Sequence, residues 1–179
     1  MTRYTLVIGI DPDVERNGVA ELHTSTRKLD VEALGFADTV ERLFTCRKRE
    51  AEAGGRILVA VEAGWLNESN WHLSRRDTLR SAAAKGNAVG RNHETGRKLA
   101  EMCRWLGLEL RLVKPLALHL GGSPMWKGKD GKITQPELET VTGQRLGRTN
   151  QEQRDAALLA WTAAGLPLRL VGERKGGGR

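Results

Sequence analysis

Residues 5–20, TLVIGIDPDVERNGVA, decide the fold of this chain. The apolar run over residues 6–10 is rich in β-branched side chains and too short for an amphipathic helix, so it predicts a buried strand. Asp11 follows directly, and Pro12 then fixes the backbone and removes a hydrogen-bond donor, which places the acid at the carboxyl end of the strand. A buried charge there needs compensation, which a divalent cation can provide. The alternative is that Asp11 only opens a turn, as Asx before proline often does.

A second apolar run that ends in an acid occurs at residues 57–61, followed by Glu62. Between the two runs the pattern predicts a tight turn at Asn17-Gly18, strands over residues 19–23 and 29–36, and a helix over residues 37–53 capped by Asp38. If this helix is a crossover, the two acid-ending runs are parallel neighbours. Their carboxyl ends then meet at one sheet edge, where α/β folds bind their ligands.

A third group of acids begins the last strong helix, which is predicted over residues 149–164. Glu152 and Asp155 are three residues apart, so both carboxylates lie on one side of this helix near its amino end. One alternative concerns Glu152 alone: Thr149 to Glu152 also matches a capping box, in which the Glu152 side chain would bond back to the backbone.

The middle of the chain is basic. A helix is predicted over residues 92–106, a strand over residues 108–113, a mobile stretch over residues 116–147 and, within it, a short helix over residues 136–142. Cations interleaved with tryptophans suit a surface that pairs with phosphates and stacks on bases. The candidate phosphate contacts are Arg75, Arg76, Arg91, Lys127, Lys129 and Lys132. A charged helix face and a loop kept soluble by its lysines are the alternatives.

Composition bounds the class of protein. The 179 residues are 39% hydrophobic and 28% charged, which predicts one globular domain over residues 1–171 and a disordered basic, glycine-rich tail over residues 172–179. A net charge of +7 and a pI of about 9.8 favour a polyanionic partner. The sequence contains no long apolar segment and no secretory signal, and Cys46 and Cys103 are isolated, so we expect a cytoplasmic protein with reduced, buried thiols and no membrane contact.

Clustered carboxylates indicate a hard cation rather than zinc. Such acids repel one another when ionised, so they either take raised pKa values or hold divalent cations. Two magnesium ions can activate a water on one side of a phosphodiester and stabilise the leaving oxygen on the other. The histidines at positions 23, 72, 93 and 119 show no spacing typical of metal ligands.

Four motifs in order resemble those of RuvC-type Holliday junction resolvases in the RNase H-like superfamily. They are GIDPDVERNGVA at residues 9–20, VAVEAGW at 59–65, VKP at 113–115 and EQRDAALLA at 152–160. The resemblance implies an α/β fold with a five-stranded mixed sheet of order 3-2-1-4-5, strand 2 antiparallel and helices on both faces. It also implies a homodimer that nicks four-way DNA junctions symmetrically with two Mg²⁺ or Mn²⁺ ions per site.

The resemblance also assigns roles by position. Asp11, Glu62, Glu152 and Asp155 match the metal-binding acids, and Trp65 matches an aromatic that stacks on unpaired bases. His119 and Lys132 lie near positions where the family has lysines that act at the DNA. The chain departs from the family in three places: it has Asp13 where glycine is usual and Glu152 where aspartate is usual, and residues 67–92 do not match.

The sequence therefore predicts a magnesium-dependent endonuclease for branched DNA. One alternative is an RNase H-like nuclease for RNA or other DNA structures, and another is a nucleic-acid-binding module without turnover. Clustered acids argue against a module, because a binder of polyanions gains nothing from them. An actin-like ATPase also begins with a strand that ends in an acid, but the glycine-rich phosphate loop of such an enzyme is missing from the sequence.

Overall fold

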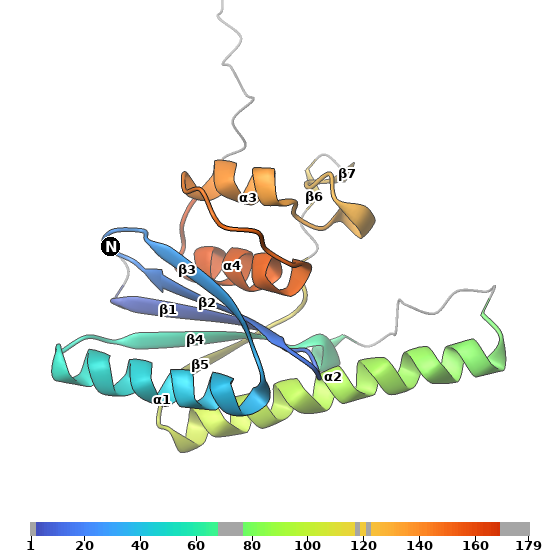
Figure 1. Ribbon diagram of the computed structural model, residues 1–179, viewed down its shortest axis with the longest axis horizontal. Coiled ribbons are helices and arrows are strands. Elements are labelled where there is room, and N and C mark those ends of the chain that lie inside the picture. Colours follow the sequence, from blue (N-terminus) through green and yellow to red (C-terminus); the bar gives the residue numbers. More distant parts are fainter. Residues whose placement is uncertain (1–2, 68–76, 117–118, 121–122, 169–179) are drawn as a thin grey trace, which may run out of the picture.

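Five strands form one mixed sheet at the centre of the computed structural model (Figure 1), which describes residues 3–67, 77–116, 119–120 and 123–168. Their order is β3-β2-β1-β4-β5, with β2 antiparallel to both neighbours and β1, β4 and β5 mutually parallel. The bounds are β1 Leu6–Asp11, β2 Asn17–His23, β3 Leu29–Leu34, β4 Ile57–Glu62 and β5 Glu109–Val113. This order confirms the predicted RNase H-like topology.

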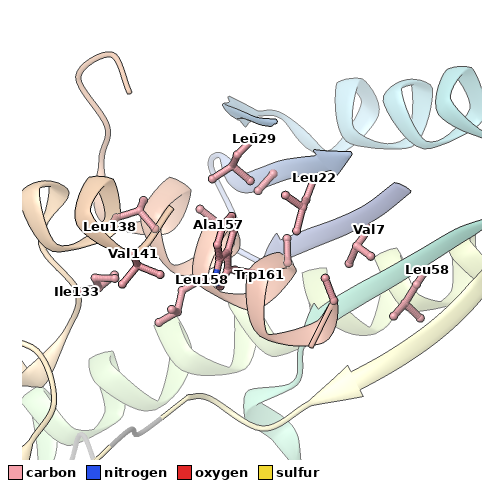
Figure 2. Close-up of a cluster of buried hydrophobic side chains, with 14 of the residues drawn as sticks. Val7, Leu22, Leu29, Leu58, Ile133, Leu138, Val141, Ala157, Leu158 and Trp161 are labelled. Carbon is pink, nitrogen blue, oxygen red and sulfur yellow. The ribbon is translucent and has the colours of Figure 1, made fainter. Parts of the chain in front are cut away.

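Helices cover both faces of the sheet (Figure 1). On one face lie α1 (Phe36–Glu52) and α2 (Leu79–Trp105), and on the other lie α4 (Gln151–Ala163) and, beyond it, α3 (Gln135–Thr142). Alternation along β1 divides the core, since Leu6 and Ile8 belong to the α1 and α2 cluster whereas Val7 packs with α4. Figure 2 shows the second cluster, in which α3 contributes Leu138 and Val141 and α4 contributes Trp161.

Glycines let α4 approach the sheet at backbone distance. A Cβ added at Gly9 of β1 would lie 2.1 Å from the Ala156 carbonyl oxygen, and one added at Gly18 of β2 would lie 2.0 Å from the Glu152 carbonyl oxygen. A side chain at either position is therefore incompatible with this packing. Because Gly18 pairs with Asp11 across the β1–β2 ladder, the contact sets the amino end of α4 beside the end of β1.

The first loop and the first helix differ from the predictions. Asn17 and Gly18 do not form a turn: they begin β2, because Asn17 is buried and its side chain donates to the Leu34 carbonyl and to Thr39 Oγ1. Asp38 does not cap α1, which starts at Phe36 after Gly35 without a side-chain cap.

The long helix and the basic stretch also differ. The helix predicted from residue 92 extends from Leu79 to Trp105, because Thr78 Oγ1 accepts from the Ser81 amide and the alanine-rich turns that follow favour helix without an apolar stripe. The stretch over residues 116–147 is structured in its described part, with β6 (His119–Leu120), β7 (Ser123–Pro124) and the 3₁₀ turn η2 (Lys129–Gly131) preceding α3. Trp126 of this stretch is buried in the α4 cluster, and this contact holds the stretch against the core.

Other predictions concern single features. Cys46 and Cys103 are buried free thiols, as predicted, and burial raises the pKa of each to about 12. Among the described residues, every helix is too short or too polar to cross a bilayer. The predicted tail over residues 172–179 lies outside the described residues.

The glycine contact under α4 can be tested by adding a methyl group. Gly18→Ala should destabilise the protein by about 1–3 kcal/mol, because the new Cβ meets backbone that cannot rotate away. The matched control is Gly90→Ala in the exposed part of α2, where a Cβ meets nothing within 4 Å. It should stabilise the protein by about 0.5–1 kcal/mol through helix propensity. Urea unfolding measures both; equal effects would contradict the close packing of α4.

Candidate active site

Asp11 and Glu62 end neighbouring parallel strands at the same level. Ile10 of β1 pairs with Val61 of β4, so the next residue on each strand is an acid at the same sheet edge. Both acids also point to the same face, because alternate positions on these strands, Val7 and Leu58, pack in the α4 cluster. The structure therefore brings these two sequence-predicted residues together beneath the amino end of α4.

Helix α4, which packs on this face of the sheet, contributes two further acids, Glu152 and Asp155. Its N-cap is Asn150, whose Oδ1 accepts from the Gln153 amide at 2.8 Å while Gln153 Oε1 accepts from the Asn150 amide at 2.8 Å. The capping-box alternative for Glu152 is therefore wrong, since the box is shifted by one residue and uses Gln153. The Glu152 carboxylate is not used by the cap, and it lies one turn from Asp155 on the same helix.

Electrostatics link the four acids. Burial raises the pKa of Asp11 well above its usual value, and the charges of Glu62, Asp155 and, most weakly, Glu152 raise it further. Burial and then the charge of Asp155 raise the pKa of Glu62 to about 7. Asp11 and Glu62 therefore lie among negative charges in partly dehydrated surroundings, which favours either their protonation or a nearby positive charge.

Lys132 supplies such a charge. Its Nζ donates to Asp155 Oδ2 at 2.7 Å. Desolvation alone would lower the pKa of Lys132, but the charges of Asp155, Asp11 and Glu62 outweigh it and raise the pKa. Lys132 thus serves here as a counterion of the acids, whereas the sequence suggested a phosphate contact.

The other Asp155 oxygen is held by its own helix. Gln151 Nε2 donates to Asp155 Oδ1 at 2.7 Å, and Arg154 in turn holds Gln151 Oε1 at 2.8 Å. Gln151 and Arg154 were not among the predicted site residues. The four-residue spacing from Gln151 to Asp155 was the available signal, because such pairs face each other on a helix.

The acids suit a divalent cation in chemistry but are not arranged around one. An all-carboxylate donor set and a net negative, partly buried pocket are what Mg²⁺ requires. Within the described ranges, however, no three acids, histidines or cysteines stand close enough to hold a metal ion. The Lys132 ammonium neutralises part of the negative charge instead, so a bound cation would compete with it for Asp155.

Trp65 packs against the protein on one side. It lies in the 3₁₀ turn η1 (Gly64–Leu66) just after Glu62, is half-buried, and has Arg97 Cζ 5.5 Å from its ring centroid. A Cβ added at Gly96 of α2 would lie 2.5 Å from Trp65 Cζ3, so the indole sits on the helix backbone. Part of the Trp65 ring therefore packs against α2 and holds η1 in place.

The remaining candidates are dispersed. Arg91, Lys127 and Lys129 are exposed. His119 lies in β6, and Arg75 and Arg76 lie outside the described residues.

Comparisons with known proteins give only distant likenesses. No protein-family profile matches the chain, and no curated protein matches it by sequence. Among solved structures, the chain is similar to RuvC of Thermus thermophilus in complex with a Holliday junction substrate, with 17% identity, a TM-score of 0.46, and 89% of this chain and 92% of that chain covered. A structure of Thermus thermophilus RuvC alone gives 15% identity and a TM-score of 0.44, with 89% and 96% covered.

The repulsion among the acids predicts an unusual pH dependence. Because the pKa of Glu62 is raised from 4.5 to about 7 on folding, the folded chain binds this proton more tightly than the unfolded chain does. Stability in EDTA should therefore fall as pH rises through that window, by up to about 3 kcal/mol. The pKa of Asp11 is also raised, in part by the charge of Glu62, so Asp11 contributes to the same pH dependence.

Glu62→Gln should flatten this slope and should be more stable than wild type at pH 8. Urea unfolding in EDTA between pH 4.5 and 8 is the measurement, with Glu101→Gln on the exposed surface of α2 as control. A slope that survives Glu62→Gln unchanged would contradict the assignment.

Proposed function

We propose that this protein is a metal-dependent endonuclease that cleaves branched DNA, with four-way junctions as its substrate. The observation that supports this most strongly is the convergence of Asp11 and Glu62, from β1 and β4, with Asp155 of α4, whose charge raises the pKa of both at one sheet edge. A structural role for three mutually repelling carboxylates would weaken the fold without benefit. Their cost is explained if they bind a cation that carries out chemistry.

In this proposal Asp11, Glu62 and Asp155 hold two Mg²⁺ ions, for which Mn²⁺ can substitute, and Glu152 is the fourth ligand. The bound ions would supply Lewis acidity to a phosphodiester and lower the pKa of an attacking water. Gln151 orients Asp155 by holding its Oδ1. Lys132, once released from Asp155, is placed to pair with a phosphate oxygen at the same edge.

The DNA would be bound by basic residues of α2 and of the segment that precedes α3. Arg91, Lys127 and Lys129 are exposed, and the chain carries a net charge of +7. Arg75, Arg76 and His119 remain proposed phosphate contacts, and Trp65 a proposed stacking residue. A four-way junction has two equivalent strands to cut, so symmetric nicking would require a homodimer with one acid cluster on each copy.

One observation favours a second candidate, a nucleic-acid-binding module without turnover. Lys132 already neutralises part of the acid cluster, and the described acids do not form a ready metal site. A protein that had lost catalysis could keep this ion pair permanently. The two candidates differ in whether Mg²⁺ displaces Lys132.

Cleavage assays test the proposal directly. Wild type should nick a labelled four-way junction symmetrically in Mg²⁺ and not in EDTA, and Asp11→Asn should lower the rate by at least about 100-fold while still binding the junction. Parallel assays with linear duplex DNA, single-stranded DNA and RNA identify the substrate class. Equal cleavage of RNA or linear duplex would move the assignment to another RNase H-like nuclease. Binding without cleavage in any divalent metal would support the module.

Thermal unfolding with Mg²⁺ separates the candidates without an activity assay. If Mg²⁺ binds the acids, a concentration 100-fold above Kd should stabilise the wild type by about 2.7 kcal/mol. Lys132→Met keeps the aliphatic stem but removes the competing charge, so it should reach half-maximal stabilisation at several-fold lower Mg²⁺. The control Lys98→Met breaks the surface pair with Glu101 and should leave the midpoint unchanged. No stabilisation of wild type or Lys132→Met by Mg²⁺ would favour the module.

A further inference from the structure

The loop between β1 and β2 is bonded to the middle of α2 by a reciprocal pair of side-chain contacts. Asn92 Nδ2 donates to Asp13 Oδ2 at 3.1 Å, and Asn92 Oδ1 accepts from the Val14 amide at 3.1 Å. One amide side chain on the helix thus engages two consecutive residues of the loop. Such a two-point contact fixes both the position and the orientation of the loop relative to the helix.

Asp13 also organises the loop internally. Its Oδ1 accepts from the Glu15 amide at 2.8 Å and from the Arg16 amide at 3.3 Å, and its own amide donates to Asn17 Oδ1 at 3.1 Å. Asn17 is completely buried and is tied to Thr39 of α1. Both carboxylate oxygens and the backbone amide of Asp13 are therefore hydrogen-bonded, two residues after Asp11.

The same part of α2 touches the segment that follows Glu62. A Cβ at Gly64 would lie 2.7 Å from His93 Nε2, and a Cβ at Gly96 would lie 2.5 Å from Trp65 Cζ3 and 3.1 Å from Pro12 Cγ. One turn and a half of helix thus contacts both the residue after Asp11 and the residues after Glu62. This stretch of α2 is therefore a shared contact for the two segments that follow Asp11 and Glu62.

We propose that Asp13 and Asn92 are positioning residues that set where Asp11 lies relative to Glu62. The proposal deepens the proposed nuclease function and rests on it for its catalytic consequence. Hydrogen bonds hold the loop after Asp11 to α2, and packing holds η1 after Glu62 to the same helix, so α2 serves as a common brace for the two acids.

An exchange of the two side chains tests the brace. Asn92→Asp alone places two carboxylates against each other, so the contact should break. In the double variant Asp13→Asn/Asn92→Asp, the amide at position 13 donates to the carboxylate at position 92, which still accepts from the Val14 amide. The oxygen of the amide still accepts from the Glu15 and Arg16 amides. Every hydrogen bond of the pair is therefore kept.

Asn92→Asp should lower kcat on the four-way junction at saturating Mg²⁺ by about tenfold or more, with KM nearly unchanged, because the acids and not the DNA surface are displaced. The double variant should recover most of kcat. The control is Gln144→Ala, which removes an amide that likewise accepts from one backbone amide, of Leu29, and donates to one backbone carbonyl, of Arg27, away from the acids. It should leave kcat unchanged.

Hydrogen exchange provides a readout that is independent of nuclease activity. In Asn92→Asp, amides of residues 13–17 and of residues 64–67 should both exchange faster, and the double variant should restore both. Two results would overturn the brace. One is faster hydrogen exchange that is confined to residues 13–17. The other is a double variant that regains its stability but not its kcat. If wild type cleaves no substrate, the nuclease proposal fails, and the exchange data alone decide whether α2 braces both loops.

Discussion

Mutual repulsion among half-buried carboxylates is the constraint on which the rest of this structure depends. Asp11 and Glu62 would not be tolerated side by side in an isolated sheet, since burial and like charge both oppose their ionisation. Packing of the surrounding core keeps the two carboxylates side by side. Two apolar clusters, one on each face of the sheet, provide the stability against which this repulsion acts. The sheet edge that carries the acids thus lowers the stability of the fold locally, and the two apolar clusters compensate for this cost.

The elements around this edge follow from that constraint. Glycines at positions 9 and 18 bring the backbone of α4 onto β1 and β2, so that Asp155 reaches the strand ends. On the other face, α2 contacts the segments that follow both strands, through Asn92 and Gly96. Lys132 then places a positive charge against Asp155. Each of these contacts either brings the carboxylates together or compensates their negative charge. This arrangement is expected of a site that binds a cation.

Much of this arrangement could be predicted from local patterns. Two short apolar runs, each ending in an acid and separated by a helix, predict two parallel neighbouring strands and the meeting of Asp11 with Glu62. The full strand order followed only from the resemblance of the four motifs to a known family. The helical spacing of Glu152 and Asp155 predicted their shared side. What could not be predicted depends on tertiary contacts: Lys132 has no local signal for pairing with Asp155, and Asn17-Gly18 has the composition of a turn but forms strand because α4 and Thr39 pack against it. The outer half of α2 has no apolar stripe, so periodicity could not reveal it.

The most direct test of the account is the anomalous scattering of a crystal grown with Mn²⁺. The account predicts an anomalous peak bonded to the carboxylates of Asp11, Glu62 and Asp155, with the Lys132 ammonium moved away from Asp155. A crystal saturated with Mn²⁺ that shows no peak at this edge, and in which Lys132 still pairs with Asp155, would contradict it.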